Sequence, residues 1–481
     1  MSFLRPSLRV SAVVSGVALL AGLVSVTPGA SAAPAPSRAP SAAASTARAA
    51  APAPARAGAR YPGQPPRNYV PYSGPRFGYL GRGMAEQSRI RNQVLATINS
   101  TWGGPRDRHG LPLATNGTIR IATWSFGDKG IAKALYAAYL RGVSVQVMSA
   151  ASINQTHPEL SWLRKRLGSA SYKRGLAGTQ EKVSFVRTCN GSCRGRGGTQ
   201  HAKFFLFDNV GYAHHRKIVF QGSMNLTSFA WHGQWNTAEV SQNTPAYDQF
   251  LSVFKEMRPG TYVNNPYRDF SYDQPVESFF FPLQPWTSWN DPVLRMLNRT
   301  RCSNAGVYAH TKIRIIQYAI YQSRGEKIAK RLRQLWNQGC DIAIIYSVTT
   351  RPVLNILRNH SGRGAIPMKQ SIIRKSDGTI AKYNHSKWMM IAGNYGGQPY
   401  QWRTISGSAN WANLAISSDE QMQIINGYAD GKAYQQAFNN TWVQRTSGPP
   451  TLAYISDGRV LPLPENNIPW GTGIYKHMQE D

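Results

Sequence analysis

The sequence is poor in acidic residues, in cysteine and in long apolar runs. It has 23 Asp and Glu against 55 Lys and Arg, a formal net charge of +32 over 481 residues, and four cysteines. This excess of cations attracts anionic polymers, anionic membrane surfaces and phosphate substrates through long-range electrostatics, without selecting among them. We find no nucleotide-binding loop, metal-ligand cluster or cofactor motif, so we expect no cofactor.

Only the N-terminal segment has an apolar run of the export or membrane-anchor type. Two arginines precede an apolar stretch from about residue 10 to residue 26, and Ala30-Ser31-Ala32 has the small side chains of a cleavage site. This layout predicts a secretory signal peptide over residues 1–32, and hence a secreted protein, with a membrane anchor as the alternative. The Ala- and Pro-rich composition of residues 33–75 predicts a disordered linker.

Two segments share a compound motif at matched spacing. HAKFFLFD begins at His201 and is followed by GSMN at Gly222, whereas HSKWMMIA begins at His385 and is followed by GSAN at Gly407. The step from His to Gly is 21 residues in the first copy and 22 in the second. A lone His-x-Lys is usually an ordinary strand segment, but two copies with the same downstream motif indicate a duplicated functional unit.

The duplication extends upstream of these motifs. IRIATWSF, which begins at Ile119, corresponds to IRIIQYAI, which begins at Ile313. In each copy an apolar run, a stretch with helical spacing, a glycine and a second β-branched run follow one another, which predicts a strand, a crossover helix and a parallel strand. We therefore predict an α/β fold of two repeated halves, residues 76–285 and 286–481, packed about a pseudo-twofold axis with a cleft between them.

The residue types of the repeated motif suit cleavage of a phosphodiester. A His and a Lys one residue apart on a strand point to the same side, so an imidazole and an ammonium can meet at one phosphate. The apolar residues after each Lys predict a buried strand beneath the site. Glycine in the GSxN segments allows close backbone approach, and the Ser and Asn can hold phosphate oxygens or orient a histidine. Packing of the two halves would place two such sets around one anionic group.

These motifs resemble the signature of the phospholipase D superfamily, a duplicated HxKxxxxD followed by GSxN, over about residues 80 to 430. The resemblance implies that one histidine attacks phosphorus to form a phosphohistidine, while the other protonates the leaving alcohol and then activates water or an acceptor alcohol. By position it assigns His201 as the nucleophile and His385 as the general acid. It further implies phosphate-neutralising lysines, a catalytic-motif aspartate and substrate-binding Ser and Asn residues: Lys203, Lys387, Asp208, Ser223, Asn225, Ser408 and Asn410.

The second motif departs from this signature, because Ala392 stands where the family has Asp. The resemblance implies that this Asp supports the strand more than it touches phosphate, so that its loss need not abolish activity, and Asn394 is a candidate replacement. The family also implies a carboxylate that orients each histidine and fixes its tautomer. Glu239 and Glu420 are the candidates, with Gln421 opposite Glu239 when NTAEV is aligned with SDEQM, and ordinary surface acids are the alternative.

The four cysteines fall in two local pairs. Cys189 lies close to Cys193, and Cys302 precedes Cys340 within the second half. An even number of cysteines in an exported protein favours disulfide bonds. A metal site formed by Cys189, Cys193 and His201 is the alternative for the first pair.

Two further groups of residues have competing interpretations. His214 and His215, with Lys217, form a rival histidine motif just before Gly222, and we expect them to lie in a loop at the mouth of the cleft. Four tryptophans flank the GSxN segments, and we expect core packing for most of them, with a cleft wall or a base-stacking surface as the alternative for one or two: Trp231, Trp235, Trp402 and Trp411.

Three functions are compatible with these residues. The one we favour is a secreted hydrolase of the phospholipase D type that acts on phospholipids at a membrane surface, with or without transfer to alcohols. The second is a secreted, metal-independent nuclease of the same superfamily, which would take nucleic acid. The third is a degenerate relative that binds phosphate-rich surfaces without turnover. Because both halves lie in one chain, we expect a monomer.

Overall fold

The structure is a computed structural model. All of the residues it describes belong to one compact unit, Ala59–Asp481. The predicted signal peptide and most of the predicted linker lie outside the described residues. No helix in the described part of the chain is long and apolar enough to cross a membrane. The described ranges are 69–105, 107, 111–154, 157–168, 182–272, 276–376, 380–443 and 452–453.

The first half is built on a mixed sheet that has seven strands among the described residues, in the order β1-β8-β6-β5-β2-β3-β4. β2 and β3 are parallel and are joined by helix α3 (Lys129–Leu140), as the strand–helix–strand pattern predicts. β4 is also parallel to β3, and the other neighbours are antiparallel. The strands are β1 (Gly74–Phe77), β2 (Thr118–Thr123), β3 (Ser144–Ala150), β4 (Phe185–Cys189), β5 (Phe204–Asp208), β6 (Ile218–Gly222) and β8 (Thr237–Gln242).

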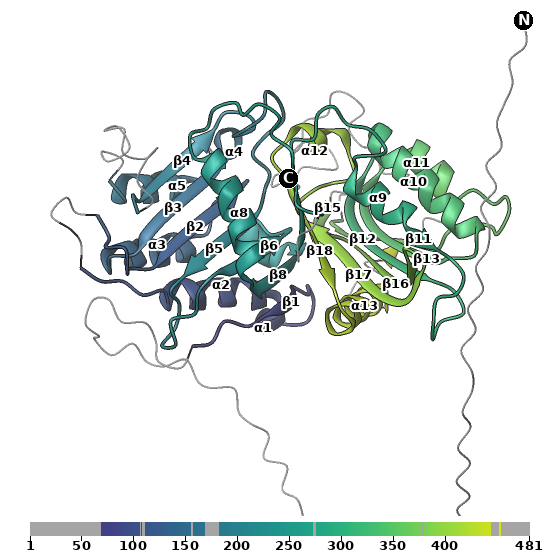
Figure 1. The fold of residues 1–481 in the computed structure, drawn as a ribbon, viewed down its shortest axis with the longest axis horizontal. Coiled ribbons are helices and arrows are strands. Elements are labelled where there is room, and N and C mark those ends of the chain that lie inside the picture. Colours follow the sequence, from purple (N-terminus) through teal and green to yellow (C-terminus); the bar gives the residue numbers. More distant parts are fainter. Residues whose placement is uncertain are drawn as a thin grey trace, which may run out of the picture. The chain divides into compact units, whose positions relative to one another are not determined.

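Helices cover both faces of this sheet (Figure 1). α2 (Arg89–Asn99), α3 and α5 (Pro158–Arg166) pack on one face, and α8 (Thr244–Met257) packs on the other. Because successive strand residues face opposite sides, Phe205 contacts the α2 and α3 side while Phe204 contacts α8. Burial of both faces explains why the run after Lys203 is apolar at every position. The described residues of this half also form three short helices: α1 (Met84–Gln87), α4 (Ala151–Asn154) and α7 (Ser228–His232).

The second half repeats this plan on a larger mixed sheet, whose order is β7-β15-β14-β13-β12-β16-β17-β18-β10-β9, with β11 beside β16 and β19 beside β14. β12 and β13 are parallel and are joined by helix α10 (Gln322–Asn337), which matches the β2-α3-β3 unit. The strands are β7 (Gln234–Trp235), β9 (Arg268–Asp269), β10 (Glu277–Phe280), β11 (Thr300–Arg301), β12 (Lys312–Ile320), β13 (Asp341–Thr349), β14 (Met368–Arg374), β15 (Ile380–Asn384), β16 (Lys387–Tyr395), β17 (Gln398–Gly407), β18 (Gln421–Asn426) and β19 (Leu452–Ala453).

Helices again cover both faces of the sheet. α9 (Pro292–Asn298), α10, α11 (Arg351–Leu357) and α12 (Asn413–Ser417) contribute to one apolar core, and α13 (Tyr428–Val443) contributes to the core on the opposite face. Two α/β halves, each with a sheet covered by helices, are therefore present as the sequence predicts.

The chain crosses between the halves at several points. β7 comes from the first half in sequence but pairs in parallel with β15 of the second. β10 precedes the predicted boundary at residue 285 and pairs with β18. A parallel bridge also joins Gln200 to Asp419. These exchanged segments lie next to the repeated motifs, so the two motifs are held by backbone pairing between the halves.

Both predicted disulfide bonds are present, Cys189–Cys193 and Cys302–Cys340. The first bond uses the two sulfurs that a metal site with His201 would have required. The metal alternative for this pair is therefore wrong in the structure.

Candidate active site

The two His–Lys pairs have the same local geometry. His201 and Lys203 come directly before β5, and Lys387 is the first residue of β16, two residues after His385. Nζ of Lys203 donates to the carbonyl oxygen of His201 at 2.8 Å, and Nζ of Lys387 donates to that of His385 at 2.9 Å. All four side chains are buried. Each lysine therefore stays beside its own histidine.

The glycine of each GSxN segment allows two strands to approach closely. A Cβ atom at Gly222 would collide with the carbonyl oxygen of Thr237, and one at Gly407 would collide with that of Gln421. The missing side chain lets β6 pack against β8 and β17 against β18 at these points. The serine that follows each glycine is thereby placed beside the segment that supplies the partner of a histidine.

A carboxylate from the second half holds His201 of the first. Nδ1 of His201 lies 2.7 Å from Oε1 of Glu420, and Oε2 of Glu420 accepts a hydrogen bond from the hydroxyl of Ser408. Because a carboxylate only accepts, Nδ1 carries the proton and Nε2 carries the lone pair. Glu420 is only 2% exposed, so water does little to weaken this contact.

An amide from the first half holds His385 of the second. Nδ1 of His385 lies 2.9 Å from Oδ1 of Asn236, which also accepts from the hydroxyl of Ser223 at 2.8 Å. Nδ2 of Asn236 donates to the carbonyl oxygen of Ala230 at 2.9 Å and to Oε1 of Gln234 at 3.1 Å. These donations fix which way the amide faces. Nδ1 of His385 is therefore the donor, which leaves Nε2 as the ring atom that can carry or release a proton.

Asn236 and Glu420 occupy the same position in the two copies. The backbone N–H of Ser223 donates to the carbonyl of Thr237, and that of Ser408 donates to the carbonyl of Gln421, both at 2.9 Å. The residue before each acceptor is the partner of a histidine, and it lies 13 residues after the serine in the first copy and 12 in the second. Counting from the serine would have found Asn236 in the sequence.

The prediction that Glu239 orients a histidine is therefore wrong. Glu239 lies on β8, paired with Gln221, and its Oε2 accepts from the hydroxyl of Tyr434 at 3.2 Å. Burial raises the pKa of Glu239 well above its ordinary value; the charge of Asp430 adds to this, and the hydrogen bond from Tyr434 opposes it. The equivalent of Glu239 in the second half is Gln423, because the matched registers pair Gly222 with Ala238 and Gly407 with Met422. The alignment of NTAEV with SDEQM, which sets Glu239 opposite Gln421, is therefore displaced by two residues from the register of the strands.

Gln421 has a role that sequence patterns did not reveal. Its Oε1 accepts from the backbone N–H of Lys203 at 2.8 Å. Its Nε2 donates to the carbonyl oxygens of Lys203 and Gly222, at 2.9 and 3.1 Å. This side chain from the second half therefore fixes the backbone that carries the first His–Lys pair.

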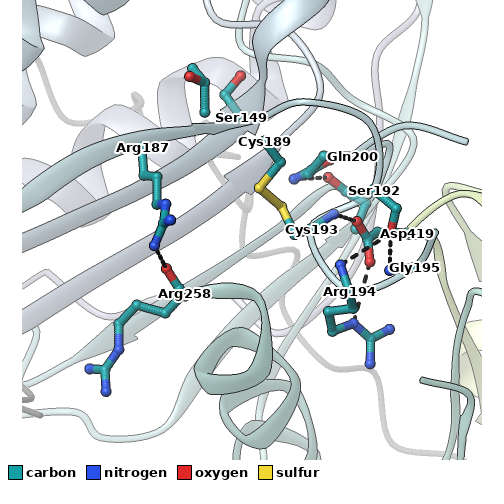
Figure 2. The surroundings of a disulfide bond; sticks show 12 residues. Ser149, Arg187, Cys189, Ser192, Cys193, Arg194, Gly195, Gln200, Arg258 and Asp419 are labelled. Atoms are coloured by element: carbon teal, nitrogen blue, oxygen red, sulfur yellow. Dashed lines mark hydrogen bonds and ion pairs between the residues drawn. A yellow bond between two sulfur atoms is a disulfide. The ribbon is translucent and has the colours of Figure 1, made fainter. Parts of the chain in front are cut away.

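The loop closed by the first disulfide forms hydrogen bonds with Asp419, the residue next to Glu420 (Figure 2). The Asp419 carboxylate accepts from the backbone N–H of Cys193 and from Nε of Arg194, the latter at 3.3 Å. The backbone N–H of His201 donates to the Asp419 carbonyl at 3.0 Å. Burial raises the pKa of Asp419 although the charge of Arg194 opposes the shift. The loop closed by Cys189 and Cys193 thus ties Glu420 to the segment that carries His201.

One pocket is lined by His201 of the first half and by Tyr318 of the second half, which packs against His385. Trp124 packs edge-on against His201 with ring centres 5.7 Å apart, and Tyr318 packs against His385 at 5.0 Å. The two aromatic residues occupy equivalent positions in the repeated IRI segments, and sequence reasoning missed both. The pocket has a volume of about 100 Å³. It is lined by Trp124, Thr199, His201, Tyr318, Tyr321, Asn410, Ala412, Leu414, Ala415, Ser418 and Glu420.

The serines and asparagines of the GSxN segments have different positions. Ser223 and Ser408 hold Asn236 and Glu420, as described above. Oδ1 of Asn225 accepts from the backbone N–H of Ser125 at 3.4 Å, whereas Asn410 lines the pocket. A direct role of these residues in substrate binding stays a prediction.

The motif aspartate does not join the site. Asp208 is the last residue of β5, at the opposite end of the strand from His201, where it pairs with Thr118 and lies 3.3 Å from the guanidinium of Arg216. Its counterpart Ala392 pairs with Lys312 in the matching register. The catalytic assignment of Asp208 is therefore corrected to a place at the strand end.

Asn394 does not replace the missing aspartate, because its amide donates to the carbonyl oxygens of Ser303 and Asn304 at 3.1 and 3.2 Å. These contacts tie it to a loop beside β16. The proposal that Asn394 compensates for Ala392 is therefore not supported by its position.

The rival histidine motif lies in a loop, as predicted, but not at the pocket. The ring of His214 stacks on Trp102 at 4.6 Å, and its Nδ1 lies 2.7 Å from Oδ1 of Asn209. Both partners lie beyond the far end of β5. The predicted position at the mouth of the cleft is wrong, because the turn follows the strand end that points away from His201.

Most of the flanking tryptophans pack in the core. Trp231, Trp235 and Trp411 are at most 3% exposed, and Trp402 is half-buried against the α13 core. The expectation of core packing is confirmed for these residues. The aromatic pocket wall comes from Trp124, Tyr318 and Tyr321 instead.

A duplicated α/β fold with two His–Lys pairs, each held by the opposite half, is the arrangement of the phospholipase D superfamily. Residues 113–258 and 307–442 match the family described as cardiolipin synthase, PLD-like domain, and the chain belongs to that family. The two matched segments contain one His–Lys motif each, so the duplication inferred from the sequence is confirmed.

Solved structures with a similar fold include phosphatidylserine synthase from Haemophilus influenzae, at 12% identity and a TM-score of 0.48, over 77% of this chain and 86% of that one. Polyphosphate kinase from Porphyromonas gingivalis has 11% identity and a TM-score of 0.45, over 68% of this chain and 46% of that one. The phospholipase D family member Nuc from Salmonella typhimurium has 24% identity and a TM-score of 0.26, over 38% and 92%. No curated protein sequence matches the chain significantly.

Proposed function

We propose that the protein is a phosphodiesterase of the phospholipase D type that cleaves phospholipids through a phosphohistidine. The observation that carries this proposal is the reciprocal pair of contacts between the halves, Glu420 with His201 and Asn236 with His385. Both contacts keep a proton on Nδ1 and leave Nε2 to react, as the nucleophile in His201 and as the atom that carries the exchanged proton in His385.

In the first step, Nε2 of His201 attacks phosphorus and a P–N bond forms. The P–O bond to the leaving alcohol breaks, and the protonated ring of His385 gives its proton to the departing oxygen. Lys203 and Lys387 supply two positive charges to the non-bridging phosphate oxygens, where negative charge grows in the transition state.

In the second step, the oxygen of water or of an acceptor alcohol attacks phosphorus and the P–N bond breaks. The ring of His385, now neutral, takes the proton of the attacking oxygen, so that both histidines return to their starting states. With water the reaction is hydrolysis, and with an alcohol it is transfer of the phosphatidyl group.

The lining of the pocket favours a lipid over a nucleic acid. It contains three aromatic side chains and the apolar Ala412, Leu414 and Ala415, but no Lys or Arg. Leu414 is 55% exposed, so an apolar surface continues outward from the pocket. A nucleic-acid strand would need a cationic groove along its backbone. A nuclease remains the second candidate, supported by the net charge of +32.

Export of the protein is part of the proposal. Two disulfide bonds close the four cysteines, and structural disulfides are typical of oxidising compartments outside the cytosol. An anionic membrane surface as partner and a monomeric state are likewise proposed, the first from the net charge and the second from the presence of both halves in one chain.

Parallel assays of the mature protein in excess chelator, on phosphatidylcholine vesicles and on plasmid DNA, test this function. We expect release of head group that is lost in both His201→Ala and His385→Ala. Cleavage of DNA alone, lost in the same variants, would move the protein to the nuclease class. Binding of vesicles or DNA without turnover of either would make it a binding relative.

A further inference from the structure

The proposed mechanism gives the two histidines different tasks, and the side chains that hold them differ in charge. We infer that this difference assigns the tasks: the Glu420 carboxylate makes His201 the carrier of the phosphoryl group, and Asn236 is a positioning residue that keeps His385 as the proton carrier. The inference rests on the proposed function and deepens it. It replaces an assignment by family position with one based on contacts in this chain.

The carboxylate suits the histidine that becomes phosphorylated. When Nε2 of His201 bonds to phosphorus while Nδ1 keeps its proton, the ring becomes a cation. Oε1 of Glu420, at 2.7 Å from Nδ1, then makes a hydrogen bond between opposite charges. His201 is 6% exposed and Glu420 is 2% exposed, so this attraction is screened little by water. The contact therefore stabilises the intermediate and the transition state that leads to it.

The amide suits the histidine that has to give up a proton and take one back in each cycle. A fully charged partner would stabilise the protonated ring in both steps and hinder release of the proton. Oδ1 of Asn236 holds the ring and its tautomer at 2.9 Å without a net charge. Proton transfer is most efficient when neither form of the carrier is strongly favoured.

The surroundings of Asn236 are matched to an amide. Its Nδ2 faces two acceptors, the carbonyl of Ala230 and Oε1 of Gln234, and its Oδ1 faces two donors, Ser223 and His385. A carboxylate at this position would place one oxygen against two acceptors with no proton between them. The neutral partner is thus built into the fold around residue 236.

Two matched substrates separate the tasks. Phosphatidylcholine releases an alcohol that needs a proton, whereas phosphatidyl-p-nitrophenol releases a phenolate that does not. Both are presented in the same detergent micelles, and release of the first product is followed over the first turnover. For Asn236→Ala we expect choline release to fall about 100-fold while p-nitrophenol release stays within about threefold of the unmodified protein.

Glu420→Gln is the matched change on the other histidine. It keeps a hydrogen-bond acceptor for Nδ1 of His201 and removes the charge. We expect both leaving groups to slow by a similar factor, about 10- to 100-fold, because formation of the P–N bond is affected whatever leaves. Peptide mapping after a quench in denaturant at alkaline pH, where the P–N bond survives, should find the phosphoryl group on His201.

Ser223→Ala is a smaller companion change, which keeps the test decisive if the Asn236 variant does not fold. It removes the hydroxyl that donates to Oδ1 of Asn236 and accepts from the backbone N–H of Thr237 at 3.0 Å. We expect the same dependence on the leaving group, with a smaller loss. Equal slowing of both substrates by the Asn236 and Ser223 variants, or a phosphoryl group on His385, would overturn the inference. If the unmodified protein turns over neither diester, the proposed function fails instead of the assignment.

Discussion

The two halves of the chain share a backbone plan but differ in the charges placed on it. At the position that holds a histidine, the first half has Asn236 and the second has Glu420. At the last position of the His–Lys motif, the first half has Asp208 and the second has Ala392. At the matched position of β8 and β18, the first half has Glu239 and the second has Gln423. Each equivalent pair thus contains a single acid, while the backbone hydrogen bonds around it are kept.

This comparison separates the positions that are the same in both halves from the positions that differ. Glycine and serine of the GSxN segments determine how close the strands lie, so they are the same in both copies. The acid positions are occupied in one half only, and those acids serve different purposes. Only Glu420 contacts a histidine, whereas the other two lie at a strand end and within the sheet.

Removal of either motif histidine tests whether both halves are needed for activity, and it should have the largest effect on kcat. We expect His201→Ala and His385→Ala each to lower kcat on phospholipid by about 10⁴-fold or more, since one loses the nucleophile and the other the proton carrier. Head-group release measures the effect, and His214→Ala, stacked on Trp102 far from the pocket, is the control. A mixture of the two inactive variants should stay inactive if each monomer supplies both halves. Restored activity in the mixture would show that segments are exchanged between chains.

Replacement of the motif lysines tests whether the halves contribute equally to phosphate binding. Lys203→Met and Lys387→Met should each lower kcat by about 10²- to 10³-fold, because both ammonium groups are buried beside their histidines in the same way. Lys217→Met, which removes a lysine paired with Asp248 on the surface, is the control. A large loss in one variant and none in the other would mean that the phosphate is held by one half.

Local patterns were sufficient to predict the two α/β halves, the strand–helix–strand units, the His–Lys pairs and both disulfides. Apolar periodicity, glycine stops and cysteine spacing act over short stretches of chain and survive without knowledge of packing. Asn236, Gln421 and Trp124 were missed for another reason. The first two act on residues of the opposite half, and the third is an aromatic residue at the end of a buried strand. No local pattern marks such a residue as part of a site.

Removal of the first disulfide should mainly lower activity, whereas removal of the second should mainly lower stability. Cys189→Ser with Cys193→Ser loosens the loop that grips Asp419, so we expect kcat to fall about 10-fold with a small change in stability. Cys302→Ser with Cys340→Ser opens a loop of much greater length, with a sequence separation of 38 against 4, and should cost about 4 kcal/mol of unfolding free energy. Kinetics and urea unfolding of both double variants measure the two effects. Equal changes in kcat would contradict the role of the first loop.

Glu239→Gln makes β8 of the first half resemble β18 of the second, which has Gln423 at the matched position. Burial raises the pKa of Glu239 above its ordinary value of 4.5. Above that value the unfolded chain releases a proton that the folded chain keeps, so stability falls as pH rises through the folded pKa. We expect the variant to be more stable than the unmodified protein at pH 8 and similar to it at pH 4, by thermal unfolding. A difference that does not change with pH would disprove the assigned shift.

Restoration of the missing aspartate should have the smallest effect on activity. Ala392→Asp completes the second motif, and a catalytic role for this position would make the variant faster. Asp208, the residue it would imitate, follows His201 by seven residues along an extended segment, a span of about 20 Å. Its partner is Arg216, which lies away from the pocket. A carboxylate at residue 392 would instead be buried beside Trp402, and we expect a loss of stability of about 1–3 kcal/mol with kcat within about threefold.

Asp208→Ala, which makes the first half resemble the second, should likewise leave kcat within about threefold. Head-group release by both variants is the measurement. A rise of kcat in Ala392→Asp together with a fall of kcat in Asp208→Ala would show that an aspartate at this motif position does act on the histidine.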